Sequence, residues 1–296
     1  MLKRKGREDM KKKEKSAALF QEHVHAIRCP ICNSPMKVVE LKSLICLQNH
    51  SFDFAKQGYV NLLTRPVKSN YDKELFKARQ SIITESDLYL PLHQKISDMI
   101  LEHVDREEVI VFDAGCGEGS HLQKILKECR DEKMVGIGLD ISKEGIRQAA
   151  SQYEGISWIV GDLANSPIAD QSCHYILNIL SPANYKEFNR ILVPDGFVIK
   201  VVPNSNYLKE LREVLFDQPN KKSYTNDETV SLFSEQFKLI DVVNLKYTEE
   251  LTKQQSTNLI EMTPLAWNVS KDDVEQIIER GIPEVTVDLD ILIGRK

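Results

Sequence analysis

One stretch of the chain combines an apolar run with closely spaced glycines and a carboxylate, and this combination suits ligand binding. The run Val109–Phe112 predicts a buried parallel strand, which continues into Asp113 and the turn AGCGEGSH. Gly115, Gly117 and Gly119 let the backbone approach a ligand closely, and their G-x-G-x-G spacing is shorter than the G-x-G-x-x-G of pyrophosphate-binding folds. The turn therefore predicts a site for a nucleoside-bearing ligand. Taken alone, a tight connection between a strand and a helix is the alternative.

Two further carboxylates follow the next two predicted strands. Asp140 ends the strand Met134–Leu139, 21 residues after Gly119, and Asp162 follows the strand Ile156–Val160. A carboxylate at the first position can accept hydrogen bonds from both ribose hydroxyls of an adenosine, as acidic residues do in nucleotide-binding α/β folds. A carboxylate at the second position can meet the exocyclic amine of an adenine. Three acids on successive strand ends therefore favour an adenosine ligand.

A second group of residues suits a metal ion. Two residues separate Cys29 from Cys32, and Cys46 and His50 follow after a short hairpin-like segment. Thiolates and an imidazole at this spacing supply the four ligands of one structural zinc ion and leave no position open for water. The metal would supply the folding energy of so small a segment. The alternative is a pair of buried thiols with a hydrogen-bonded histidine.

The strands that position the three acids repeat at helix-sized intervals. His174–Asn178 and Phe197–Val202 predict a fourth and a fifth strand. Near the end of the chain, Lys238–Asn244 and Val285–Ile293 predict an antiparallel pair, with helices between them. We therefore expect an α/β fold with a Rossmann-like, seven-stranded and mostly parallel sheet.

The order of these motifs resembles the class I S-adenosylmethionine-dependent methyltransferases. The matching stretches are D-A-G-C-G-E-G, then G-L-D and then G-D-L, each at the end of a predicted strand. The resemblance implies S-adenosylmethionine as the cofactor. The cofactor contacts that we predict on these stretches are Asp113, Gly115, Gly117, Gly119, Ser120, His121, Asp140, Asp162 and Leu163.

The N-terminal part of the chain narrows this resemblance to one family. C-P-x-C, then C and H, and then F-D-x-A-K-x-G-Y-V-N-L-L are similar to the start of the 23S ribosomal RNA (guanine-N1)-methyltransferases. Further matches are Ala78-Arg79, Y-x-P-L from Tyr89 and M-T-P-L-A-W from Met262, so the resemblance covers about residues 28–294.

Two tyrosines enter the predicted cofactor site through this family. Tyr89 begins a helix predicted over Leu88–Val104, and the resemblance implies that it reaches the methionine end of the cofactor; a packing role is the alternative. The family places a histidine near the cofactor at the position of Tyr207, so this chain departs from the pattern there. The departure puts the cofactor role of Tyr207 in doubt.

Charge is distributed unevenly along the chain. Residues 1–80 carry 17 basic and 8 acidic side chains, a net charge of +9, and residues 81–296 carry −14 of the total of −5. A basic N-terminal part on an otherwise acidic chain is expected of a protein that presents one face to a polyanion. Together with the resemblance, it predicts a 23S rRNA hairpin as the partner, with one guanine captured by the core. A solvated basic tail is the alternative.

We expect four segments: a basic, flexible arm at 1–27, a zinc-binding RNA-recognition module at 28–65, a basic linker at 66–85 and a methyltransferase domain at 86–296. Within the arm, the sequence is compatible with a short helix over 16–27, and His23 and His25 have no ligand spacing and are expected at the surface. The chain has neither a membrane-length apolar run nor the core of a signal peptide, so we expect a cytoplasmic protein without a membrane partner. The resemblance implies a homodimer.

The expected reaction is methyl transfer from S-adenosylmethionine to N1 of a guanine in 23S rRNA. The N1 proton must leave before or during the attack, which requires a base or a polarising contact to O6. Ser181 and Asn184 follow the fourth strand closely enough to contact the base, but neither is a convincing general base, so that role stays unassigned. Trp267 offers a stacking face for the base, with a plain core tryptophan as the alternative.

Two other functions stay open at this point. In the first, the same core methylates another RNA, a protein or a small molecule. This function leaves the zinc module and the basic N-terminal part of the chain unexplained. In the second, the chain is a non-catalytic RNA-binding protein. The intact set of Asp113, Asp140 and Asp162 argues against the second.

Overall fold

The computed structural model describes residues 10–67, 71–102, 108–131, 133–216 and 225–296. Its helices and short helical turns are α1 (Lys12–Glu22), η1 (Val24–Ala26), α2 (Lys73–Glu85), α3 (Leu90–Leu101), α4 (Ser120–Cys129), α5 (Lys143–Gln152), η2 (Leu163–Asn165), α6 (Tyr185–Ile191), α7 (Lys209–Leu215), α9 (Asp227–Gln236), α10 (Lys253–Met262), η3 (Pro264–Asn268) and α11 (Lys271–Arg280). Its strands are β1 (Met36–Val39), β2 (Ser43–Cys46), β3 (Ser51–Asp53), β4 (Val60–Asn61), β5 (Val109–Ala114), β6 (Met134–Asp140), β7 (Ile156–Val160), β8 (Cys173–Ile179), β9 (Leu192–Pro203), β10 (Lys238–Glu250) and β11 (Glu284–Arg295).

The central sheet has the strand order β10-β11-β9-β8-β5-β6-β7-β4. The strands from β9 to β4 run parallel, and β11 is antiparallel to both β9 and β10. This is the class I methyltransferase architecture that the sequence predicts, with eight strands where seven were expected. The additional strand is β4, which is two residues long and comes from the segment assigned to the zinc module. Its Val60 is fully buried, and Leu62 N donates to Val160 O at 2.8 Å.

Helices cover both faces of this sheet because its central strand is buried on both sides. Side chains alternate along β5, so that Val109 and Val111 join the apolar core on one face while Ile110 and Phe112 join the core on the other. The first core also takes residues from α3, α4, α5, α10 and α11, and the second takes residues from α1, α6 and α9. The carboxyl ends of the parallel strands, with the turns that follow them, therefore meet at one edge of the sheet.

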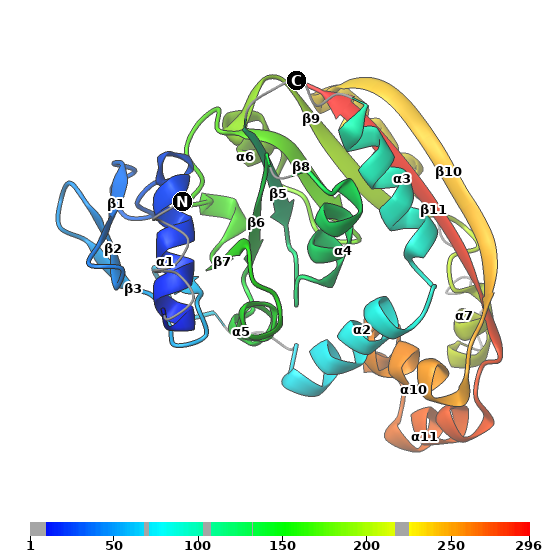
Figure 1. Cartoon of the computed structure of the whole chain (residues 1–296). Helices are drawn as coiled ribbons and strands as arrows, with labels where there is room; N and C mark the ends of the chain where they lie inside the picture. Colours follow the sequence, from blue (N-terminus) through cyan, green and yellow to red (C-terminus); the bar gives the residue numbers. More distant parts are fainter. Residues whose placement is uncertain (1–9, 68–70, 103–107, 132, 217–224) are drawn as a thin grey trace.

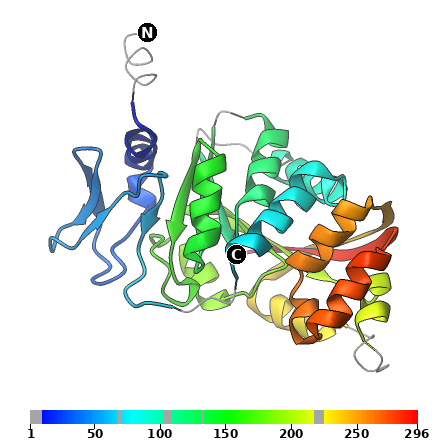
Figure 2. The same cartoon turned by 90° about the horizontal axis from the view of Figure 1, so that it is seen from below.

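The first described residues form a docked helix that begins earlier than the short helix considered over 16–27, so the prediction of flexibility is wrong for residues 12–26. In α1, Ala17 and Phe20 are fully buried, and the Phe20 ring meets Phe54 edge-on at 5.1 Å. Beyond η1, Arg28 N donates to Pro167 O at 2.8 Å. The many lysines of α1 conceal this apolar face in the sequence. Residues 1–9 of the predicted arm lie outside the described residues. Figures 1 and 2 show α1 between the small β1-β2-β3 sheet and the central sheet.

Residues 73–85 form helix α2, which contradicts the prediction of a linker over 66–85. The Asp72 carboxylate accepts a hydrogen bond from Leu75 N at 2.8 Å and so caps the helix. Its buried side chains include Phe76, Ile82 and Ile83, which recur at helical spacing among lysines and polar residues. Lys68, expected in the same basic segment, lies outside the described residues. The helix therefore belongs to the core rather than to a connection.

The last part of the chain matches the expected antiparallel pair, with longer strands. β10 and β11 pair along nearly their whole length, and α10, η3 and α11 lie between them in the chain. The helix expected over Leu88–Val104 is α3, which begins two residues later; residues 103 and 104 lie outside the described part. Among the described helices, none is long and apolar enough to cross a membrane.

His23 is fully buried, although a surface position was expected for it. Its Nε2 lies 2.8 Å from Ser157 Oγ on β7, while Nδ1 is buried without a hydrogen-bond partner in the described part of the chain. Burial, with a smaller contribution from His25, lowers the pKa of His23 to about 4. A neutral His23 is therefore part of the contact between α1 and the central sheet.

We predict that His23 makes folding sensitive to mild acid. The unfolded chain takes up a proton near pH 6.5, whereas folded His23 resists protonation to about pH 4, so its contribution is complete above pH 6.5 and falls as the pH drops toward 4. Between pH 7.5 and pH 5 the loss is about 2 kcal/mol. In urea unfolding, the free energy of unfolding of His23→Gln should therefore fall by about 2 kcal/mol less than that of the wild type over this pH range. The control His25→Gln, whose side chain is 60% exposed, should keep the full drop. An equal drop in His23→Gln and wild type would contradict this role.

Candidate functional site

The glycine turn after β5 has a backbone that other residues cannot easily adopt. Gly115, Gly117 and Gly119 all have positive φ, at 83°, 60° and 80°. A Cβ on Gly119 would lie 2.3 Å from the Trp158 ring, and a Cβ on Gly115 would lie 2.9 Å from Ser181. The glycines therefore serve the packing of the turn as well as the close approach of a ligand.

Asp140 at the end of β6 holds this turn in place. Its Oδ2 accepts a hydrogen bond from Gly117 N at 2.8 Å, and its Oδ1 accepts one from Ser142 N at 2.7 Å. Burial raises the pKa of Asp140, against these two hydrogen bonds, which lower it. Asp140, which is predicted to bind the ribose, thus also connects the glycine turn to the start of α5.

Acidic side chains gather around the turn. Asp113 is 2% exposed, and burial raises its pKa to about 7 against the opposing effect of Arg79. Glu118, between two of the glycines, is fully buried, and its Oε2 lies 3.0 Å from Arg79 Nε of α2. With Asp140, the turn holds three carboxyl groups and one facing guanidinium. In the sequence, Arg79 stands out only as a family match, and Glu118 is marked only as a charged residue inside a glycine turn.

Three other predicted contacts lie at the start of α4 and on the segment that follows β7. Asp162 is exposed at the end of β7, where its carboxylate accepts a hydrogen bond from Ala164 N at 2.8 Å, and Leu163 is half-buried beside it. Because β7 lies next to β6, Asp162 and Asp140 share one edge of the sheet. Ser120, at the start of α4, is buried and its hydroxyl lies 2.8 Å from the Tyr153 hydroxyl.

His121 and the two predicted tyrosines meet in the wall of a cavity. The hydroxyls of Tyr89 and Tyr207 are 2.6 Å apart, and the His121 ring meets the Tyr89 ring edge-on at 5.1 Å. His121 Nδ1 also lies 2.8 Å from Nε2 of His93, and burial lowers the pKa of both histidines. Both imidazoles are therefore neutral near pH 7. Tyr207 thus lies beside Tyr89 in the cavity wall, and its contact with the cofactor stays a prediction.

The cavity has a volume of about 800 Å³. It lies between α2, the ends of β8 and β9, α9 and the connection after α10, and Ser181, Tyr185 and Met262 are among its lining residues. Asn184 caps α6 by accepting a hydrogen bond from Glu187 N at 3.1 Å and is not a lining residue. Trp267 is 44% exposed and packs edge-on against Tyr71 at 5.0 Å, outside the lining. The space is large enough for a nucleotide-sized group.

A buried ammonium group lies at this cavity. Lys200 of β9 is 5% exposed, and its Nζ donates to Asn178 Oδ1 at 2.6 Å and to Ser181 O at 3.4 Å. No carboxylate of the described residues forms an ion pair with it. Burial lowers its pKa to about 8. A buried cation with only neutral partners favours a ligand that carries negative charge. Lys200 was not among the predicted site residues, and its one signal in the sequence is a lysine inside the apolar run FVIKVV.

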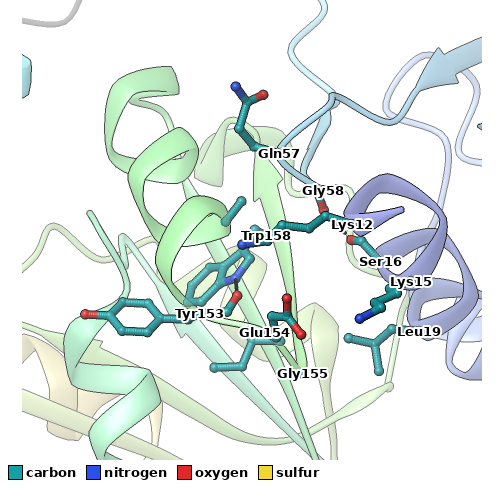
Figure 3. A pocket seen from close by; sticks show the side chains of 12 residues that line it. Lys12, Lys15, Ser16, Leu19, Gln57, Gly58, Tyr153, Glu154, Gly155 and Trp158 are labelled. Carbon is teal, nitrogen blue, oxygen red and sulfur yellow. Dashed lines mark hydrogen bonds between the residues drawn. The ribbon is translucent and has the colours of Figure 1, made fainter. Parts of the chain in front are cut away.

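A second, smaller hollow of about 280 Å³ lies where α1 meets the core (Figure 3). Ser16 donates a hydrogen bond to Gly58 O, and Lys12 Nζ donates to Ser151 O at 2.6 Å. Trp158 and Glu154 line the other side, and Figure 3 shows the side chains of Lys12 and Ser16 close to Gly58. These contacts fasten α1 to the core, and none of the groups is arranged for a reaction.

The predicted metal ligands come together in the small sheet. Cys29, Cys32, Cys46 and His50 offer ligand atoms that all lie within 4.8 Å of one another. Sγ of Cys46 lies 3.6 Å from Sγ of Cys32 and 3.4 Å from Nδ1 of His50, and Sγ of Cys29 lies 3.5 Å from the same nitrogen. A tetrahedral zinc ion with the usual bond lengths requires edges of about 3.8 Å between sulfurs and about 3.6 Å between sulfur and nitrogen. The donor set therefore fits one structural zinc ion.

We predict that Lys200 titrates near pH 8. Labelling with an amine-directed reagent over a pH series, followed by mass spectrometry of the Lys200 peptide, should give a midpoint near this value, because the ammonium is desolvated. Asn178→Asp should raise the midpoint, since a carboxylate would replace the amide oxygen 2.6 Å away. A midpoint near 10.5, the value of an ordinary lysine, would contradict the burial of this charge.

Comparisons with known proteins agree with both parts of this arrangement. A zinc-ribbon family model described as "RlmA, N-terminal" matches residues 27–71, and one described as "Methyltransferase domain" matches residues 111–196. The chain is 42% identical over 272 residues to the Bacillus subtilis protein named "Putative 23S rRNA (guanine-N(1)-)-methyltransferase YxjB", with 91% of this chain and 96% of the relative covered. It is 30% identical over 276 residues to the 23S rRNA (guanine(748)-N(1))-methyltransferase of Streptomyces fradiae, with 92% and 97% covered.

Both relatives are matched along nearly their whole length, zinc-ribbon segment and methyltransferase core together. The resemblance drawn from the sequence motifs is thereby confirmed. S-adenosylmethionine is the cofactor of such a core, and the cysteine and histidine cluster agrees with one structural zinc ion. The chain belongs to the 23S rRNA (guanine-N1)-methyltransferase family.

Proposed function

We propose that this chain transfers a methyl group from S-adenosylmethionine to N1 of a guanine in a hairpin loop of 23S rRNA, and that it does so as a homodimer in the cytoplasm. The observation that carries the proposal is the full-length match to relatives named for this reaction, at 42% and 30% identity. The zinc module and the methyltransferase core are both needed to explain that match. The homodimer is supported by the family resemblance.

The cofactor would lie at the carboxyl ends of β5, β6 and β7. When bound, S-adenosylmethionine supplies an electrophilic methyl group on a sulfonium sulfur. Asp140 and Asp162 would hold the adenosine, and the acids of the turn suit the positive charges of the methionine end. We assign the cofactor contacts to Tyr89, Asp113, Gly115, Gly117, Gly119, Ser120, His121, Asp140, Asp162, Leu163 and Tyr207.

The 800 Å³ cavity would receive the target guanine beside the methionine end of the cofactor. Ser181 is already engaged, since its hydroxyl donates to Ala114 O at 2.8 Å and lies 2.6 Å from the amide of Asn178. This engagement argues against Ser181 as the general base. Lys200 is the lining group whose charge suits the negative charge that develops on the guanine as its N1 proton leaves.

The zinc module would grip the RNA backbone. Its exposed lysines include Lys37 and Lys56, and Lys11, directly before α1, is also exposed. Because α1 and β4 fasten this module to the edge of the central sheet, backbone contacts there would fix the position of a base that enters the core (Figure 2). Such contacts make RNA binding depend strongly on salt.

We predict that the purified, zinc-loaded chain forms 1-methylguanosine on an unmodified 23S rRNA hairpin. Labelled S-adenosylmethionine and nucleoside mass spectrometry of the digested RNA measure the product. Asp140→Asn should lower product formation, and the control Asp195→Asn, on the exposed turn within β9, should not. Methylation of a protein or a small molecule, or of another base, would contradict the proposed acceptor. Cofactor binding without any product would support the non-catalytic alternative.

We predict that loss of one zinc ligand removes RNA methylation without removing cofactor binding. Cys32→Ser should lower the bound zinc from one ion per chain to nearly none, measured by native mass spectrometry, because three ligands hold the metal poorly. The cofactor contacts lie on other elements, so the Kd of S-adenosylhomocysteine should stay within about threefold of wild type. Cys129→Ser, at a buried cysteine of α4, should keep its zinc. Full methylation by a zinc-free variant would contradict the role of the module.

A further inference from the structure

Arg79 projects from α2 toward the glycine turn. Its side chain is 22% exposed and lines the large cavity, and its Nε lies 3.0 Å from Glu118 Oε2. A Cβ on Gly117 would lie 3.1 Å from one terminal nitrogen of Arg79 and 3.3 Å from its Cζ. The guanidinium therefore lies directly against the backbone of the turn, at a position that glycine keeps open.

The guanidinium of Arg79 is only partly used. An arginine side chain has five N–H donors in a planar fork, and this fork matches the two oxygens of a carboxylate. In the described part of the chain, Glu118 is the ion-pair partner of Arg79, and Nε is the guanidinium nitrogen closest to it. Arg79 lines the cavity, and its two terminal nitrogens make no hydrogen bond with the described residues.

Glu118 has the properties of an anchor for this arginine. It is fully buried, and neither of its carboxylate oxygens accepts a hydrogen bond in the described part of the chain, so the ion pair with Arg79 is its compensation. Leaving a carboxylate buried without a partner is costly, so Glu118 favours the orientation of Arg79 that is seen here. Because Nε is the atom engaged, the paired ends of the fork stay available.

We propose that Arg79 binds the carboxylate of the methionine end of S-adenosylmethionine, and that Glu118 is a positioning residue for it. The inference rests on the proposed placement of the cofactor at the glycine turn. The carboxylate is the one anionic group of this cofactor, and Arg79 is the cation that faces the turn. Of the two other cations of the cavity wall, Lys200 is the one assigned above to the guanine, and Arg212 donates to Ser205 O.

This contact would connect the cofactor to the acceptor side of the site. Arg79 lies on α2, which follows the zinc module in the chain and packs against α10. Asn258 of α10 donates a hydrogen bond to Ser81 Oγ of α2 at 2.9 Å. Met262, the last residue of α10, lines the cavity. A bound carboxylate would therefore hold α2, and with it this wall of the cavity, against the glycine turn.

The test compares two ligands that differ in the amino-acid end. S-adenosylhomocysteine carries the carboxylate, and 5′-methylthioadenosine has the same adenosine and sulfur without it. Calorimetry on the full-length, zinc-loaded chain gives both values of Kd. Arg79→Gln should raise the Kd of S-adenosylhomocysteine about 10- to 100-fold and leave the Kd of 5′-methylthioadenosine within about twofold of wild type. Arg79→Lys should restore part of the loss, because it keeps the charge without the fork.

Three further variants make the outcomes separable. Arg147→Gln removes a partly exposed arginine of α5 and should change neither ligand. Asp140→Asn should raise the Kd of both ligands, since both contain the ribose. If it raises neither Kd, the proposed cofactor placement fails. Glu118→Gln should weaken S-adenosylhomocysteine less than Arg79→Gln does, and should leave 5′-methylthioadenosine unchanged.

Equal weakening of both ligands by Arg79→Gln, while Asp140→Asn behaves as expected, would overturn the proposal and assign Arg79 a general role in the fold. Unchanged binding of both ligands together with weaker RNA binding would also overturn it, in favour of a contact to an RNA phosphate. Thermal unfolding checks that each variant is folded. If Arg79→Gln does not fold, the comparison rests on Arg79→Lys, which should still weaken S-adenosylhomocysteine selectively.

Discussion

The two hydrogen bonds that Asp140 accepts hold the centre of this molecule together. They join the glycine turn after β5 to the start of α5, across the carboxyl ends of two neighbouring parallel strands. The turn glycines have positive φ, and Gly119 fits tightly against Trp158. Because the turn is fixed, the acids around it have defined positions. The guanidinium of Arg79, on α2, lies against this turn and lines the large cavity.

The second constraint is the rigid connection between the zinc module and the core. The short strand β4 extends the central sheet, and α1 covers its edge through Phe20 and His23. The zinc module is therefore packed against the central sheet rather than joined to it by a linker alone. An enzyme that acts on one base in a folded RNA benefits from such a connection, because contacts far from the reaction then determine which base reaches the cofactor.

Local patterns in the sequence were sufficient to predict the chemistry and the fold class. Glycines after an apolar run, acids at strand ends and cysteines at metal-ligand spacing depend on neighbours in the chain, and all of them appear where they were expected. What the sequence did not predict depends on distant contacts. β4 is a strand only because β7 lies beside it, and lysines concealed the apolar faces of α1 and α2. The burial of His23 and Lys200, and the meeting of Arg79 with Glu118, likewise need the assembled structure.

The most direct measurement is nucleoside analysis of 23S rRNA from cells with and without the gene for this chain. The account predicts that 1-methylguanosine is lost on deletion, and that purified, zinc-loaded protein with S-adenosylmethionine restores it to the isolated RNA at a single hairpin. Unchanged amounts of every methylated guanosine after deletion would contradict the account. The fold and the zinc cluster would then stand, and the acceptor would be another molecule.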